Sequence, residues 1–230
     1  MSFSSVSVVV FDLDDTLYPE RQFVESGFRA VCAFVTQRGI CSVDLFPVMW
    51  GLFCDGMRGT IFNSALEQAG IVPEPGLIAQ LVDLYRSHSP AISLYSDVPG
   101  IFRFCRVHDK KICLLTDGYL DVQRRKVEAL NIEDWFDSIV YTDALGPDFW
   151  KPHPAGFEKI MDQLQFPAEK HIYVGDNPCK DFAGPNALGW KTVCVHRSDG
   201  LYPADNETDN PAYRADVRIA GLNQLVDLLD

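Results

Sequence analysis

The sequence predicts an α/β protein: a Rossmann-like core built on a parallel sheet, with an α-helical cap inserted after the first strand. Two patterns predict this fold class. From residue 112 onward, strand-like segments alternate with helical ones, as in the βαβ units of a parallel sheet. Between residues 19 and 93, helical segments follow one another with no strand between them. We therefore expect the core to cover residues 1–18 and 94–230, and the helical cap to cover residues 19–93.

The predicted strands are short, apolar and rich in β-branched residues, which is typical of a sheet buried on both faces. They cover residues 6–11, 112–116, 138–142, 171–175, 191–195 and 216–219. Helices are predicted at residues 20–38, 44–53, 60–68 and 74–87 in the insert, and at 121–130, 155–164, 181–188 and 221–229 in the core. Residues 198–215, which contain several Asp, Asn, Gly and Pro residues, are predicted to form a long surface loop.

The composition is that of an acidic globular protein. The 230 residues carry a formal net charge of -12, which argues against general binding of nucleic acid or of anionic membrane surfaces. The seven cysteines are odd in number and have no C-x-x-C spacing, so free thiols are expected rather than a disulfide framework or a zinc site. The first apolar run, Val8–Phe11, is too short for a secretory or membrane-spanning segment. We expect a cytoplasmic protein with neither a nucleic-acid nor a membrane partner.

Polar residues follow the predicted strands at the points where those strands end. Asp12 and Asp14 follow the first strand, and Thr116 ends the second. Lys151 follows the third strand, and Asp176 comes directly after the fourth. Ligands of open α/β sheets bind at the carboxyl ends of the strands, so these side chains are expected to converge on one site.

These residues belong to four short motifs that together resemble a known family. F-D-L-D-D-T at residues 11–16, T-D-G at 116–118, K-P at 151–152 and G-D-N-x-x-x-D at 175–181 are similar, in order and spacing, to the motifs of the haloacid dehalogenase-like (HAD) superfamily. The resemblance covers nearly the whole chain. The helical insert between the first and second motifs resembles the helical-cap class of that superfamily.

The resemblance implies a phosphatase that works through an aspartyl-phosphate. Asp12 would be the nucleophile, and a carboxylate is already ionised at neutral pH. Asp14 would be the general acid and base. Thr116 and Lys151 would complete the catalytic set. The phosphoryl group would be bound by Thr116 and Lys151 together with the backbone amides of Asp117 and Gly118.

The resemblance also implies a Mg²⁺ cofactor. Asp12 and Asp176 would be its carboxylate ligands, and the backbone carbonyl of Asp14 would be a third protein ligand. Asp181 is expected to orient these ligands or Lys151 rather than to bind the metal directly. The second motif often has Asn where this chain has Asp117, and we expect that carboxylate to point away from the phosphate and to contribute only its N–H. The substrate is expected to be a small phosphorylated metabolite, such as a sugar phosphate or a nucleotide, selected by the cap and by residues 18–21.

Other activities on the same fold are weighed against this one. A dehalogenase of the family lacks a carboxylate at the position of Asp14. A phosphonatase uses a lysine of the cap, and residues 19–93 contain no lysine. A phosphomutase would keep the same residues and stays an alternative. A non-catalytic binding protein, the remaining alternative, would be expected to have lost at least one of the motif residues, and all are present.

Overall fold

A computed structural model of the chain describes residues 2–202 and 210–230. Within this part, the chain forms two compact units. Of the described residues, 2–20, 93–202 and 210–230 belong to the first unit, and 21–92 belong to the second.

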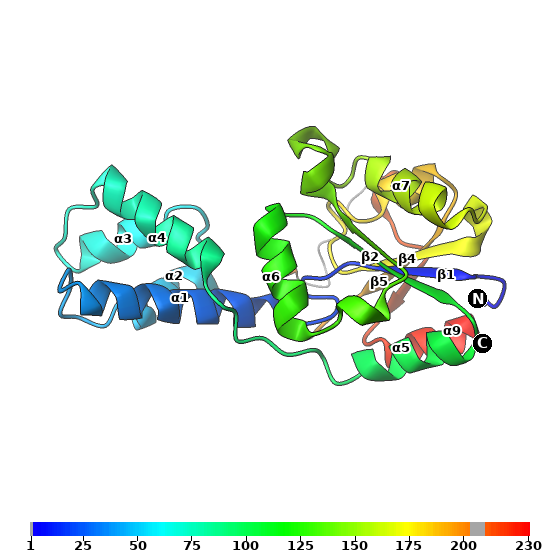
Figure 1. Cartoon of the computed structure of the whole chain (residues 1–230), viewed down its shortest axis with the longest axis horizontal. Coiled ribbons are helices and arrows are strands. Elements are labelled where there is room, and N and C mark those ends of the chain that lie inside the picture. Colours follow the sequence, from blue (N-terminus) through cyan, green and yellow to red (C-terminus); the bar gives the residue numbers. More distant parts are fainter. Residues whose placement is uncertain (1, 203–209) are drawn as a thin grey trace. The chain divides into compact units, whose positions relative to one another are not determined.

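A parallel sheet of six strands forms the centre of the first unit (Figure 1). Its strands are β1 (Val8–Phe11), β2 (Lys111–Thr116), β3 (Ser138–Tyr141), β4 (His171–Gly175), β5 (Lys191–Val195) and β6 (Val217–Ile219). Their order across the sheet is β3-β2-β1-β4-β5-β6, and every neighbouring pair is parallel. The predicted fold class is therefore confirmed. β1 lies in the interior of the sheet with all four of its side chains buried, which explains its continuous apolar sequence.

Helices cover both faces of this sheet. α5 (Val98–Val107) and α9 (Asn223–Leu229) pack against each other on one face, and α7 (Ala155–Leu164) packs against β2 and β3 on the opposite face (Figure 1). α6 (Leu120–Leu130) follows β2, and the short α8 (Ala183–Ala187) follows β4. Single 3₁₀ turns lie at Glu133–Trp135, Thr142–Leu145, Pro147–Phe149, Ala168–Lys170 and Pro211–Tyr213.

Two helices of the first unit differ from the prediction. α5 has no counterpart among the predicted helices; it begins with Val98-Pro99-Gly100, and both Pro and Gly usually mark helix boundaries. Pro99 fits here because a helix leaves the N–H groups of its first turn without partners. The helix predicted at 181–188 is shorter in the structure, because the turn after β4 extends past Asp181. The predicted loop at 198–215 lies partly outside the described residues, and its described part contains one 3₁₀ turn.

The second unit is helical. It contains α1 (Glu20–Gln37) apart from its first residue, together with α2 (Phe46–Cys54), α3 (Ile61–Gln68) and α4 (Pro75–Ser87). Aromatic side chains form its interior: Phe28 packs edge-on against Phe53 and Phe62, and it also contacts Tyr85. These aromatic residues therefore serve the packing of this unit.

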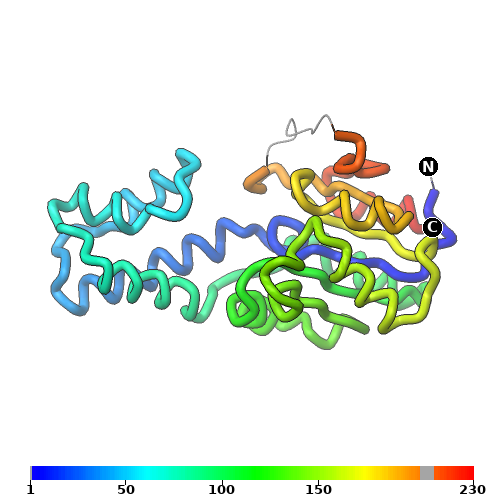
Figure 2. Tube along the Cα trace, turned by 90° about the horizontal axis from the view of Figure 1, so that it is seen from above, coloured from blue at the N-terminus to red at the C-terminus, as the bar shows by residue number. Residues whose placement is uncertain are grey.

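The beginning and the end of the described chain meet on the first unit (Figure 2). The amide of Phe3 donates to the carbonyl of Leu228, at 2.6 Å. Among the described residues, no helix has the length and apolarity that crossing a membrane requires.

Candidate active site

Three neighbouring strands bring the predicted site residues to one edge of the sheet. Phe11, the last residue of β1, is in register with Leu114 of β2 and with Val174 of β4. Asp12, Thr116 and Asp176 therefore lie together at the carboxyl ends of their parallel strands. The chain moves outward from β1 to β2 and β3 and then returns to the other side of β1 as β4, and ligands of open α/β sheets bind at such a reversal.

Lys151 makes the central ion pairs of this edge. Its side chain is fully buried, and Nζ donates to Asp12 Oδ1 and to Asp181 Oδ1, both at 2.7 Å. Nζ also donates to the hydroxyl of Tyr173 at 2.8 Å. Burial alone would lower the pKa of Lys151, but the two carboxylates outweigh it and raise this pKa well above its usual range. Lys151 is therefore a cation fixed beside Asp12.

Asp12, Asp176 and Asp181 form an acidic cluster in which one carboxylate oxygen of each lies within 4.8 Å of the others. Burial raises the pKa of Asp12 to about 6, although the charge of Lys151 acts in the opposite direction. Burial and the charges of Asp181 and Asp12 raise the pKa of Asp176 well above its usual range. Lys151 alone does not neutralise the cluster, and such a set of oxygen donors is suited to a hard divalent cation.

Both oxygens of Asp181 have hydrogen-bond partners from the protein. Oδ1 accepts from Lys151, and Oδ2 accepts from the amide of Asn177 at 2.8 Å. Asp181 is completely buried. A side chain on residue 175 would begin only 2.5 Å from Asp181 Oδ2, which explains the glycine at the end of β4. Asp181 therefore holds both Lys151 and the turn that carries Asp176.

Asp14 has a different set of partners from those of Asp12. Its Oδ1 accepts from Lys126 Nζ at 2.6 Å and from the hydroxyl of Tyr18. Its Oδ2 accepts from Gln123 Nε2 at 2.9 Å. Burial raises the pKa of Asp14, but the charge of Lys126 and the hydrogen bonds from all three donors outweigh burial and lower it.

Thr116 ends β2, and Gly118 lies in the turn that follows. Gly118 has a φ of 119°, a conformation that side chains with a Cβ rarely adopt. Thr116 is completely buried, and its Oγ1 accepts from Gln123 Nε2 at 2.6 Å. Gln123 therefore contacts both Thr116 and Asp14.

The side chain of Asp117 has a role that the sequence did not reveal. Its Oδ1 accepts from Thr142 Oγ1 at 2.7 Å and from the backbone amide of Lys151 at 3.1 Å. Beside the N–H expected to serve the phosphate, the side chain thus has protein partners of its own. Its carboxylate holds the segment that carries Lys151, and the nearest charged partner of its Oδ2 is Lys180, at 3.5 Å.

Several residues outside the motif positions donate to or accept from the predicted site residues, among them Tyr18, Gln123, Lys126, Thr142 and Tyr173. Tyr18 was expected to help select the substrate, but it is completely buried. In the sequence, Gln123 and Lys126 are ordinary polar residues of a helix. Their only signal is their spacing of three, which places both on one helix face directly after the second motif.

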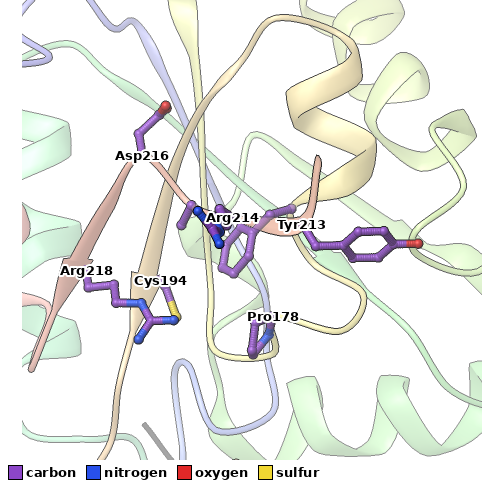
Figure 3. A pocket seen from close by; sticks show the side chains of 8 residues that line it. Pro178, Cys194, Tyr213, Arg214, Asp216 and Arg218 are labelled. Atoms are coloured by element: carbon purple, nitrogen blue, oxygen red, sulfur yellow. The ribbon is translucent and has the colours of Figure 1, made fainter. Parts of the chain in front are cut away.

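A separate cavity of about 240 Å³ lies elsewhere on the first unit (Figure 3). It is lined by Pro178, Phe182, Cys194, Tyr213, Arg214, Ala215, Asp216 and Arg218. None of the predicted site residues lines this cavity.

Comparison with known proteins defines the class of the chain. Residues 9–195 match the model of the haloacid dehalogenase-like hydrolase family, so the chain belongs to that family. It is 28% identical to the glyceraldehyde 3-phosphate phosphatase of Methanopyrus kandleri over 231 residues, which covers 97% of each chain. It is 29% identical to the phosphoserine phosphatase of Thermus thermophilus over 168 residues, which covers 73% of this chain and 63% of that enzyme. The predicted enzyme class, a phosphomonoester hydrolase of this family, is thus confirmed.

The fold has close counterparts among solved structures. The chain superposes on the structure of the HAD-hydrolase YfnB of Bacillus subtilis, bound to magnesium, with a TM-score of 0.70. The sequence identity of the pair is 18%, and the superposition covers 98% of this chain and 99% of YfnB. At this identity the similarity establishes the fold.

Proposed function

We propose that the chain is a Mg²⁺-dependent phosphatase that hydrolyses small phosphorylated metabolites through an aspartyl-phosphate on Asp12. One observation carries this proposal. A buried carboxylate at a strand end, Asp12, is paired with a buried lysine, Lys151, and lies within an acidic cluster that one lysine does not neutralise. Membership of a hydrolase family, and two relatives named as phosphatases, support it.

The residues present fit a Mg²⁺ ion. Asp12 and Asp176 offer carboxylate oxygens within 4.8 Å of each other, and Mg²⁺ prefers oxygen ligands. We propose that these two residues and the backbone carbonyl of Asp14 hold the ion. Because both oxygens of Asp181 have protein partners, Asp181 would orient Lys151 rather than bind the ion. When bound, Mg²⁺ would offset the negative charge of the phosphoryl oxygens and of the cluster.

The chain's own residues account for the chemical steps. An oxygen of Asp12 attacks phosphorus, and the bond between phosphorus and the ester oxygen breaks as Asp14 gives that oxygen a proton. Lys151 stabilises the negative charge of the transferring group. Asp14 then takes a proton from water while the water attacks phosphorus, which releases phosphate and restores the Asp12 carboxylate. The first step thus starts from the protonated form of Asp14 and the second from its ionised form. The charge of Lys126 and the hydrogen bonds that lower the pKa of Asp14 favour the ionised form.

The named substrates of the relatives support a substrate class. Glyceraldehyde 3-phosphate and phosphoserine, named for the two relatives, are both small phosphate monoesters. We propose a substrate of this class for the chain. We also propose that the second unit, residues 21–92, serves as the cap that selects among such esters.

The first test is the loss of turnover in Asp12→Asn. This variant is expected to hydrolyse no p-nitrophenyl phosphate while unfolding at the temperature of the wild type. EDTA is expected to stop the wild-type reaction, and added Mg²⁺ to restore it. A broad panel of phosphorylated metabolites, ranked by kcat/KM, then identifies the substrate.

Asp162→Asn is the matched control, because it removes an exposed carboxylate from α7, away from the motifs. It is expected to keep full activity. Turnover retained by Asp12→Asn would contradict the nucleophile assignment, and activity that is indifferent to EDTA would contradict the metal requirement.

A further inference from the structure

A polar cluster outside the four motifs surrounds Asp14. Tyr18, Gln123 and Lys126 each donate a hydrogen bond to its carboxylate. All three donors are buried: Tyr18 is 0%, Gln123 is 1% and Lys126 is 4% exposed. A buried ammonium or amide is costly unless its hydrogen bonds are satisfied, so such a cluster is stable only in a defined geometry.

Gln123 and Lys126 reach Asp14 because of where α6 begins. The helix starts at Leu120, two residues after Gly118, and the amide of Leu120 donates to Asp143 Oδ2 at 2.9 Å. Residues three apart lie on one face of a helix. The phosphate-binding turn and the two donors to Asp14 are thus parts of one continuous segment.

The amide of Gln123 has only one orientation that satisfies its contacts. An ionised carboxylate only accepts hydrogen bonds, so Nε2 rather than Oε1 must face Asp14. With its second hydrogen, Nε2 also donates to Thr116 Oγ1, and the two heavy atoms are 2.6 Å apart. Thr116 Oγ1 therefore accepts from Gln123, and its own hydrogen is left to donate to another acceptor, such as a phosphoryl oxygen.

We propose that Gln123, Lys126 and Tyr18 are positioning residues that hold the Asp14 carboxylate in place and, through Gln123, aim the hydroxyl of Thr116 at the phosphoryl group. This inference rests on the proposed function, because it assigns these residues to the same reaction. None of the three attacks phosphorus or exchanges a proton with the substrate or water; they act through Asp14 and Thr116. The step that depends most on them is the attack of water on the aspartyl-phosphate, where Asp14 is the base.

Loss of a donor is expected to lower kcat more than it changes KM. Misplacement of a catalytic group by about 1 Å can cost about 100-fold in rate. We expect Gln123→Met and Lys126→Met to lower kcat by about 30- to 100-fold, with KM within about threefold of wild type. Tyr18→Phe removes one hydroxyl and leaves the ring, so its kcat is expected to fall by about tenfold.

The experiment measures kcat, KM and phosphorylated enzyme in these three variants with p-nitrophenyl phosphate and Mg²⁺. Phosphorylated chain, quenched in acid and detected by mass spectrometry, is expected to accumulate to a higher steady-state fraction than in wild type. A merely structural role would not produce this accumulation. Arg125→Met is the matched control, because it removes a positive charge from an exposed position of the same helix, and it is expected to behave as wild type.

The outcomes separate this inference from the proposed function. Wild-type kcat in Gln123→Met and Lys126→Met, beside an inactive Asp12→Asn, would overturn the inference and leave the proposed function standing. Turnover by Asp12→Asn would overturn the proposed function itself. Should the two methionine variants not fold, Tyr18→Phe decides: lower kcat with accumulated phosphoenzyme supports the inference, and unchanged kinetics contradicts it.

Discussion

Replacement of Asp117 tests how the segment that carries Lys151 is held. Asp117→Ala keeps the backbone amide of the second motif and removes only the carboxylate. The side chain of Asp117 is buried, and it accepts from the hydroxyl of Thr142 and from the amide of Lys151. The variant leaves two buried donors without their acceptor.

The expected cost follows from these two bonds. A hydrogen bond to a charged group contributes about 1.5–3 kcal/mol, and neighbouring bonds are not fully additive. We expect Asp117→Ala to lower the free energy of unfolding by about 3–4 kcal/mol. Asp117→Asn keeps an amide oxygen as acceptor and loses only the charge. The ion pair with Lys180 spans 3.5 Å, and that lysine side chain is 33% exposed, so its loss is expected to cost about 1 kcal/mol or less.

The assay is denaturant unfolding of wild type, Asp117→Ala and Asp117→Asn, together with kcat for each folded variant. The asparagine variant is expected to keep most of the stability and activity. The alanine variant is expected to lose both, because the backbone of Lys151 is no longer fixed. Equal stability of the alanine variant and wild type would refute the role assigned to this carboxylate.

Three further predictions concern buried groups of the first unit. Lys151→Met leaves two buried carboxylates without their shared cation, so metal-free protein is expected to lose about 3–5 kcal/mol of unfolding free energy; an unchanged denaturation midpoint would contradict the pairing. Arg197 donates to Asp97 and to the carbonyl of Thr16. Arg197→Met is therefore expected to lower the free energy of unfolding by about 2–4 kcal/mol in the same assay. A loss below about 1 kcal/mol would contradict a stabilising role of these contacts. Burial lowers the pKa of His171 below its ordinary 6.5, so the unfolded state binds the proton more readily and stability falls as the pH drops through that value. Thermal unfolding of His171→Phe from about pH 7 to about pH 5 is expected to show a shallower fall than wild type, and parallel curves would exclude this contribution.

The sequence predicted the sheet and the motif residues because each leaves a strong local pattern. Continuous β-branched runs mark strands buried on both faces, and carboxylates directly after such runs are costly unless they serve a site. α5 escaped prediction because Pro99 and Gly100 resemble a loop when read alone.

The supporting contacts of the site depend on the tertiary structure. Lys126 reaches Asp14 across 112 positions of the chain, and nothing in its local sequence marks it as buried. The carboxylate of Asp117 could equally have faced solvent. It is the position of Thr142, on a segment that follows another strand, that gives it a partner. Such contacts arise only once the strands are in register.

The most direct test of the central claim is detection of the phosphorylated nucleophile. Wild-type enzyme is mixed with excess p-nitrophenyl phosphate and Mg²⁺, quenched in acid, and digested for mass spectrometry. We predict a phosphoryl group on the peptide that contains Asp12, and none in Asp12→Asn. A wild-type enzyme that turns over this substrate with the phosphoryl group on another residue would contradict the assignment of Asp12.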